Sequence, residues 1–228
     1  MVRLVSEITR SEHFLCLERK KKEKGMIMDT VKYSMSFTTG GLFCQESVKI
    51  TQLYLEIHDW EQVRKDVVVK NMLQARTIST LKRVCREICS RLKTLNDSEL
   101  TLLVQGTNQE RSHILWVAIC RRYRFIRDFA IEVIRERYLT FRQNLQVEDY
   151  EAFFNSRAEW HIELEAITTT TRNKLRQVLF RMLRETELLS VGNTITPAML
   201  TPRFISIISQ SRDQDFLVFP LLDLGVKG

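Results

Sequence analysis

One segment of the sequence combines arginines with apolar residues at helical spacing. From Thr171 to Glu187, apolar residues recur at the i, i+3, i+4, i+7 spacing of a half-buried helix, and they are Leu175, Val178, Leu179, Met182 and Leu183. The cations left toward solvent are Arg172, Lys174, Arg176, Arg181 and Arg184. No acid occurs between Arg172 and Arg184, so we expect these cations to lack ion pairs and to bind phosphate. The amides of Asn173 and Gln177 on the same helix could read base edges.

The residues after this helix predict a small hairpin. Leu188–Val191 and Thr194–Ile195 flank Gly192-Asn193, a dipeptide suited to a two-residue hairpin turn. A basic helix followed directly by a hairpin is the order of a winged helix-turn-helix, whose helix enters the major groove of DNA. We therefore expect the helix to contact phosphates and the hairpin, near residues 188–196, to touch the adjacent backbone or minor groove.

Two further groups of cations are candidates for phosphate contact. The first, Lys82, Arg83 and Arg86, lies on a predicted helix from Thr77 to Leu95. The apolar stripe of that helix is Ile78, Leu81, Cys85, Ile88, Leu92 and Leu95, spaced almost as heptads. The second group surrounds the predicted junction of two long helices between Gln109 and Arg142, and consists of Arg121, Arg122, Arg124 and Arg127.

No catalytic or metal-binding pattern accompanies these cations. Cys85 and Cys89 share a helix face, but no further Cys or His pair stands at zinc-site spacing nearby, so we interpret them as core thiols. His58, His113 and His161 stand alone, without a nucleophile to activate. Acids on polar helix faces do not by themselves specify a nuclease. We expect no catalytic residue, no metal, no other cofactor and no small-molecule substrate.

The composition is that of a mainly helical, soluble protein. Of the 228 residues, 44% are hydrophobic and 28% are charged, and 7 Gly and 3 Pro are too few for a loop-rich all-β fold. The net charge of +7 favours a polyanionic partner: nucleic acid, an acidic protein surface or anionic lipid. Five cysteines without a CxxC pair favour the reduced cytoplasm. The apolar run Ile114–Cys120 is too short to span a membrane.

The sequence divides into three predicted parts. Residues 1–32 form a basic tail without the spacing of apolar residues that indicates a core. Either Met26 or Met28 could be the start of translation, so residues 1–28 need not belong to the native product. Residues 33–107 form an N-terminal helical lobe, with a possible helix-turn-helix. Residues 108–228 hold the central helical pair and the C-terminal lobe, which resembles a winged helix-turn-helix.

Hydrophobic periodicity and capping residues also locate the individual elements. The remaining predicted helices are one around Val48–Leu55, then Trp60–Val69, Ser98–Val104, Glu148–Ser156, His161–Ile167 and one or two within Pro197–Ser209. Asp97 is the expected N-cap of the Ser98–Val104 helix, and Gly106 its expected stop. Phe216–Leu222 is apolar without helical spacing, and we expect a strand or a subunit contact there.

Four segments together resemble the BrxA family of bacteriophage-exclusion (BREX) defence islands. They are YSMSFTTGGLF at 33–43, QARTISTLKR at 74–83 with REI at 86–88, RRYRFIRDFA at 121–130 and VLFRMLRE at 178–185. The resemblance runs from about Tyr33 to beyond Leu200. It implies a small cytoplasmic accessory protein of an anti-phage system, without enzymatic activity of its own, acting beside a methyltransferase, an ATPase and other components. It also implies binding to double-stranded DNA with little sequence preference.

Three functions are therefore compatible with the sequence. The first is sequence-tolerant binding of duplex DNA, mainly through phosphates, which supply affinity without selectivity. The second is a protein-protein adaptor whose basic faces dock an acidic partner of the defence complex, with Phe216–Leu222 as an apolar anchor. The third is binding of RNA by the helical body.

Overall fold

The structure is a computed structural model and describes residues 32–221 of the chain. The chain divides into two units, Met1–Lys32 and Tyr33–Gly228, and every helix described below belongs to the second. Apart from Lys32, the predicted basic tail lies outside the described residues, and so does the last residue of the segment Phe216–Leu222.

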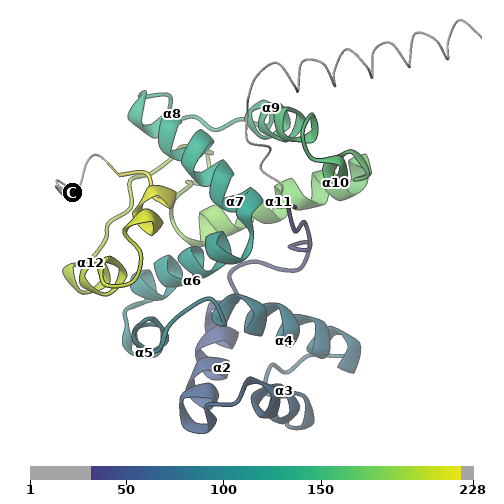
Figure 1. Cartoon of the computed structure of the whole chain (residues 1–228), viewed down its shortest axis with the longest axis vertical. Coiled ribbons are helices and arrows are strands. Elements are labelled where there is room, and N and C mark those ends of the chain that lie inside the picture. The colour runs from purple at the N-terminus through teal and green to yellow at the C-terminus, as the bar shows by residue number, and fades with distance from the viewer. Residues whose placement is uncertain (1–31, 222–228) are drawn as a thin grey trace, which may run out of the picture. The chain divides into compact units, whose positions relative to one another are not determined.

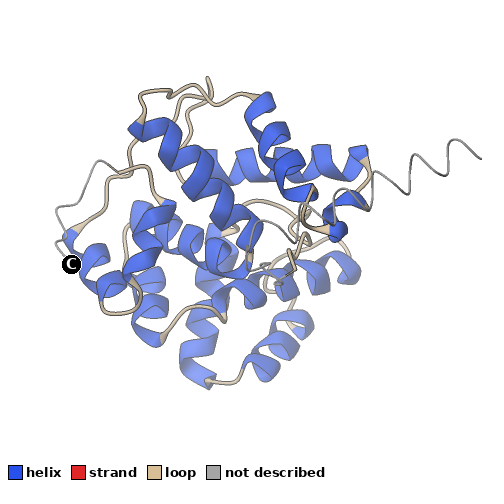
Figure 2. Cartoon of the chain, turned by 45° about the horizontal axis from the view of Figure 1, so that its top comes forward, coloured by secondary structure: helices blue, strands red, loops and turns tan. Residues whose placement is uncertain are grey.

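The fold is mainly helical, as the composition predicts (Figure 1). Figure 2 shows helices and loops, and no strand, in the part of the chain that the structure describes. The elements are α2 (Cys44–Ile57), α3 (Trp60–Val69), α4 (Ile78–Leu92), α5 (Asp97–Gln105), α6 (Asn108–Arg122), α7 (Arg124–Phe129), the π-helix η1 (Ala130–Arg135), α8 (Glu136–Leu139), α9 (Val147–Ala158), α10 (Ile162–Glu165), α11 (Thr169–Glu185), α12 (Pro202–Ser209) and the 3-10 helix η2 (Asp213–Val218).

Side-chain caps explain where several helices begin. The Asp59 carboxylate accepts hydrogen bonds from the first backbone N–H groups of α3, so that α3 has the predicted bounds. Thr201 caps α12 in the same way and Pro202 occupies its first turn, as predicted. Asn96, not the predicted Asp97, caps α5, and it forms a capping box with Glu99.

The helices α2, α3 and α4 pack on one another, and α2 and α4 also pack on α6. In α4 the predicted stripe is buried at Leu81, Cys85, Ile88, Leu92 and, just beyond the helix, Leu95. Ile78 is an exception, with 67% of its surface exposed, because it lies in the first turn, before α4 meets its neighbours. The stripe leaves the opposite face of α4 free for solvent or a partner.

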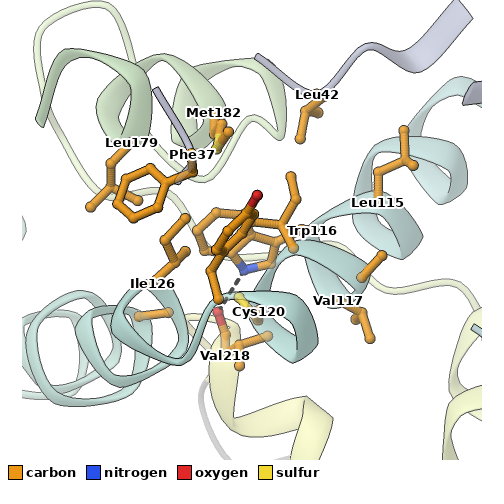
Figure 3. Packing of buried hydrophobic residues seen from close by; sticks show 14 of the residues in the cluster. Phe37, Leu42, Leu115, Trp116, Val117, Cys120, Ile126, Leu179, Met182 and Val218 are labelled. Carbon is orange, nitrogen blue, oxygen red and sulfur yellow. Dashed lines mark hydrogen bonds between the residues drawn. The ribbon is translucent and has the colours of Figure 1, made fainter. Parts of the chain in front are cut away.

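The main core is built around α6, the predicted central helix. Trp116 of α6 is fully buried, and its indole Nε1–H donates to the Val218 carbonyl at 3.0 Å. Figure 3 shows side chains from separate segments around it: Phe37 and Leu42 precede α2, Ile126 lies on α7, and Leu179 and Met182 lie on α11. Residues far apart in the sequence therefore share one hydrophobic cluster.

The segment 33–43 connects α4 with α11 through its backbone. The Arg91 guanidinium of α4 donates from Nη1 to the Gly41 carbonyl at 2.7 Å. The Leu42 N–H donates to the Glu185 carboxylate of α11 at 2.5 Å. Gly41 is buried, and a Cβ there would displace the Glu185 carboxylate from its place beside the Leu42 N–H.

Local predictions for three segments were confirmed only in part. The two helices predicted between Gln109 and Arg142 meet at Tyr123, as expected, but the second ends at Leu139 and contains the π-helix Ala130–Arg135, which buries Ala130 and Ile134. The region Pro197–Ser209 contains one helix, α12, in agreement with the predicted one or two, although Thr196-Pro197 begins no helix. Phe216–Val218 is not a strand but the end of the 3-10 helix η2, which packs on α6 and η1. Within residues 32–221, no helix has the length and apolarity required to cross a bilayer.

The burial of His113 predicts that acid destabilises the fold. His113 lies on α6 between the rings of Phe204 and Phe219, and burial lowers its pKa to about 4, against the raising effect of Glu110. A histidine pKa that is depressed on folding contributes stability above the unfolded pKa of about 6.5, and this contribution is lost as the pH falls toward 4. We expect a loss on the order of 2 kcal/mol, measured by urea unfolding between pH 7 and 4.

The matched variants are His113→Leu, which removes the titrating group at similar volume, and His58→Asn, which changes an exposed histidine. Only His113→Leu should flatten the pH dependence of the unfolding free energy. An unchanged slope in His113→Leu would contradict the prediction.

Candidate nucleic-acid interface

The helix α11 buries the predicted apolar face. The cations on its other side, however, are not all free of acidic partners. Leu175, Val178, Leu179, Met182 and Leu183 are buried, which confirms the helical periodicity. The expectation that its arginines lack acidic partners was wrong for three of them, because acids reach them from α9 and from the end of α11 itself. These ion pairs join Arg172 and Arg176 to Glu151 of α9, and Arg181 to Glu185.

The arginines paired with Glu151 are held firmly. The Arg176 Nη1 lies 2.7 Å from the Glu151 carboxylate. The Arg172 guanidinium also pairs with this carboxylate, donates to the Glu151 carbonyl at 3.0 Å and lies over the Phe154 ring at 4.2 Å from its centroid. A phosphate would have to displace an acid to reach either arginine. On α11, Lys174 and Gln177 are exposed, whereas Asn173 is half-buried.

Residues 188–196, where the hairpin is predicted, fold back on themselves through a turn that is shifted from the predicted one. Antiparallel bridges join Leu189 to Ile195 and Asn144 to Thr194. The Asn193 N–H donates to the Ser190 carbonyl at 3.0 Å, so Val191 and Gly192 occupy the centre of the turn, and Asn193 follows with φ 61°. Asn tolerates this left-handed conformation better than most residues. The predicted two-residue turn at Gly192-Asn193 was therefore wrong by one position.

Arg184 supports the hairpin instead of projecting freely from α11. Its Nη2 donates to the Asn193 side-chain oxygen at 2.7 Å. Val191 at the tip is 93% exposed. The end of α11 and the hairpin are thus joined directly.

The face of α4 carries cations without acidic partners. Lys82, Arg83 and Arg86 are exposed, and no ion pair within residues 32–221 involves any of them. Arg91 on the same helix is different, because it is buried and its Nε lies 2.7 Å from the Glu87 carboxylate. Of the three predicted groups of cations, this one is the most available to an external anion.

The arginines at the α6–α7 junction do not form an exposed group. The Arg121 side chain is 5% exposed and its Nη2 lies 2.6 Å from Glu99 and 2.7 Å from Asp215. Burial lowers the pKa of Arg121, but the hydrogen bonds and charges of the two carboxylates outweigh burial and raise it above its usual value. The expectation of a solvent-facing Arg121 was wrong, because acids from α5 and η2 enclose it.

Arg122 and Arg124 also have partners, whereas Arg127 is exposed. The Arg122 guanidinium lies over the Tyr123 ring at 5.1 Å. Arg124 pairs with Asp128 at 3.5 Å and lies over the Tyr33 ring at 5.9 Å. We therefore do not include the α6–α7 junction in the candidate interface.

Cys85 and Cys89 are thiols of the core, as predicted. Cys85 and Cys89 are buried on α4 with their sulfur atoms 4.0 Å apart, and burial raises the pKa of the Cys120 thiol. In the described part of the chain, no group of three or more His, Cys, Asp or Glu side chains is placed to hold a metal ion.

Comparison with known proteins decides the family. A family model described as BrxA matches residues 31–212. The chain belongs to the BrxA family. Its relatives include BREX protein BrxA of Escherichia coli O9:H4 (strain HS), which is 27% identical over 78% of this chain and 84% of its own length. BREX protein BrxA of Paramagnetospirillum magneticum (strain ATCC 700264 / AMB-1) is 23% identical over 80% of this chain and 93% of its own.

The fold also occurs in a solved structure. The crystal structure of an uncharacterized protein from Magnetospirillum magneticum superimposes with a TM-score of 0.74 at 22% identity. The similarity covers 82% of this chain and 97% of that one. It therefore extends over most of the helices of the BrxA-family chain.

Two cations beside α4 were not predicted from the sequence. Arg64 and Lys65 are exposed on α3 and line a groove shared with Lys82 and Arg86 of α4. The spacing of the buried Val63 and Val67 already turns Arg64 and Lys65 outward on a helix. The sequence alone does not show that this side of α3 lies next to α4.

Proposed function

We propose that this chain is a non-enzymatic accessory component of BREX phage defence that binds double-stranded DNA through its phosphates, with little sequence preference. Its BrxA-family relatives bear the name BREX protein BrxA, which supports the role in defence. The observation that supports DNA binding is the exposed face of α4, where Lys82, Arg83 and Arg86 have no acidic partner among residues 32–221. Other components of the system, including a methyltransferase and an ATPase, are the protein partners that this role requires.

The arrangement of α2, α3 and α4 supports α4 as the helix that approaches DNA. The three helices pack together, and α3 is followed by α4 after residues 70–77, which is the order of a helix-turn-helix. In that motif the second helix of the pair lies in the major groove and its neighbours contact the backbone. Cations without acidic partners release counterions from DNA on binding, which provides affinity without base recognition.

The C-terminal region supports a second, weaker contact. We infer that α9, α11 and the hairpin 188–196 form a winged helix-turn-helix, because the hairpin follows α11 directly and bridges to Asn144, in the segment that precedes α9. Lys174 and Gln177 would face the duplex. Arg172 and Arg176 would contribute less than the sequence predicts, because Glu151 already neutralises part of their charge.

A salt-resolved mobility shift on a random duplex tests this function. Contact with three to five phosphates predicts that affinity falls roughly 40- to 500-fold between 50 and 200 mM salt. A duplex RNA of matched length serves as the comparison, because its groove geometry differs from that of DNA. An affinity for DNA that stays flat over this salt range would contradict the proposal, and preference for RNA would favour the RNA-binding alternative.

A further inference from the structure

The helices α3 and α4 border an open groove of about 420 Å³ on their outward side. Its lining comes from α3 through Glu61, Arg64, Lys65, Val68 and Val69, and from α4 through Lys82, Cys85 and Arg86. The volume lies in the range of pockets that bind ligands or short segments of a partner. None of these residues belongs to the protein's hairpin or to α11, so the groove is a separate feature from the C-terminal region.

The groove combines an apolar floor with a cationic rim. Val68, Val69 and Cys85 provide the apolar part, and Val69 is 82% exposed although it is a large aliphatic residue. The rim consists of two cations from each helix: Arg64 and Lys65 from α3, and Lys82 and Arg86 from α4. Within residues 32–221 none of these four cations has an ion pair, and Glu61 is the single acid of the lining.

This combination selects among the possible occupants. A phosphate backbone would satisfy the cations but would bury little apolar surface against Val68 and Val69. A neutral amphipathic helix would cover the valines but leave four cations without counter-charges. A segment that is both apolar on one side and acidic at its edges satisfies both requirements. Charge complementarity and the apolar surface of the exposed Val69 and the half-buried Val68 therefore favour a protein segment over DNA at this groove.

We propose that the α3–α4 groove docks an acidic amphipathic segment of a partner protein. Apolar side chains of that segment contact Val68 and Val69, and its carboxylates pair with the cations of the two rims. Because α3 has ten residues and a helix rises about 1.5 Å per residue, a segment of two to three helical turns matches the length of the groove.

Docking at this groove also has a consequence for DNA. Lys82 and Arg86 belong both to the groove and to the α4 face proposed to bind phosphates. A docked acidic segment occupies these side chains, so it and DNA exclude each other. This competition rests on the proposed DNA binding, whereas docking itself does not.

The experiment uses the full chain and a fluorescein-labelled 12-residue peptide with leucines at i, i+4 and i+7 or i+8 and glutamates at the other exposed positions. Binding is followed by fluorescence anisotropy at 100 mM salt. A peptide of the same composition with the leucines scattered around the helix is the control. We expect the amphipathic peptide to bind at least tenfold more tightly than the scrambled one, and random duplex DNA to displace it.

Three variants separate docking from DNA binding. Val69→Ser, at a position that is 82% exposed, should weaken the peptide about three- to fivefold and leave DNA affinity unchanged. Arg64→Glu should weaken the peptide about tenfold. Arg83→Glu, on α4 but outside the groove lining, should weaken DNA and leave the peptide unchanged.

Equal binding of the two peptides would overturn the proposal, and so would a peptide affinity that Val69→Ser and Arg64→Glu leave unchanged. If Arg64→Glu weakens DNA while no peptide binds, the groove is part of the DNA surface and the proposal is also overturned. Peptide binding in a protein that fails to bind DNA would support docking and contradict only the proposed DNA-binding function.

Discussion

Replacing Lys82, Arg83 and Arg86 of α4 together by glutamate is expected to lower the affinity for random duplex DNA about a hundredfold or more at 100 mM salt. The substitution removes three phosphate contacts and places three negative charges against the backbone. The slope of log affinity against log salt should become shallower by roughly three, because each lost phosphate contact reduces it by about one. Mobility shifts at several salt concentrations measure both effects.

The matched control is the triple variant Lys49→Glu, Arg203→Glu and Arg212→Glu, which changes the net charge equally at exposed positions outside α4 and α11. We expect less than about a fivefold effect from it, through the overall charge of the protein. Circular dichroism verifies that both triple variants are folded. If the two variants weaken DNA binding equally, α4 is not the interface and only net charge matters.

Replacing Arg121 by methionine is expected to destabilise the protein by about 3–5 kcal/mol without a comparable effect on DNA affinity. The guanidinium is enclosed by Glu99, whose side chain is 0% exposed, and Asp215, at 10%. Removing the cation leaves two carboxylates close together, without their partner, in a site from which water is largely excluded. Urea unfolding monitored through tryptophan fluorescence measures the loss.

Arg122 provides the control, since it is the next residue on α6 and stacks on Tyr123. Arg122→Met should cost less than about 1 kcal/mol. Adding Glu99→Gln and Asp215→Asn to Arg121→Met should recover part of the stability, because no uncompensated charge then remains. A stable Arg121→Met protein that no longer binds DNA would contradict the structural role of Arg121 and would indicate that this residue contacts DNA.

The positions and buried faces of most helices were predictable from the sequence because they depend on local patterns. Helical spacing alone identified the buried side of α11 and the bounds of α3, Trp60–Val69. The π-helix was not predictable in this way, because its residues have an ordinary helical pattern and its extra residue per turn is a response to packing. The 3-10 helix η2 was missed because a short apolar run does not distinguish a strand from a tight helix.

The candidate interface was only partly predictable, because exposure can be read from one helix but ion pairing cannot. No acid stands between Arg172 and Arg184, yet Glu151 on α9, about 20 to 25 residues away, pairs with two of these arginines. Conversely, α4 has Glu87 nearby in sequence, but this carboxylate faces Arg91 and Tyr123 and leaves Lys82 and Arg86 alone. Tertiary structure thus decides which cations remain available.

The backbone around Gly41 and Leu42 has a mechanical consequence. Arg91 of α4 donates a hydrogen bond to the Gly41 carbonyl, and the Leu42 N–H donates one to Glu185 of α11. Both basic helices are therefore bonded to the same peptide group of the main chain. The distance and direction between them are therefore set by the protein. Any ligand that touches both helices at once must therefore match a spacing that the protein itself fixes.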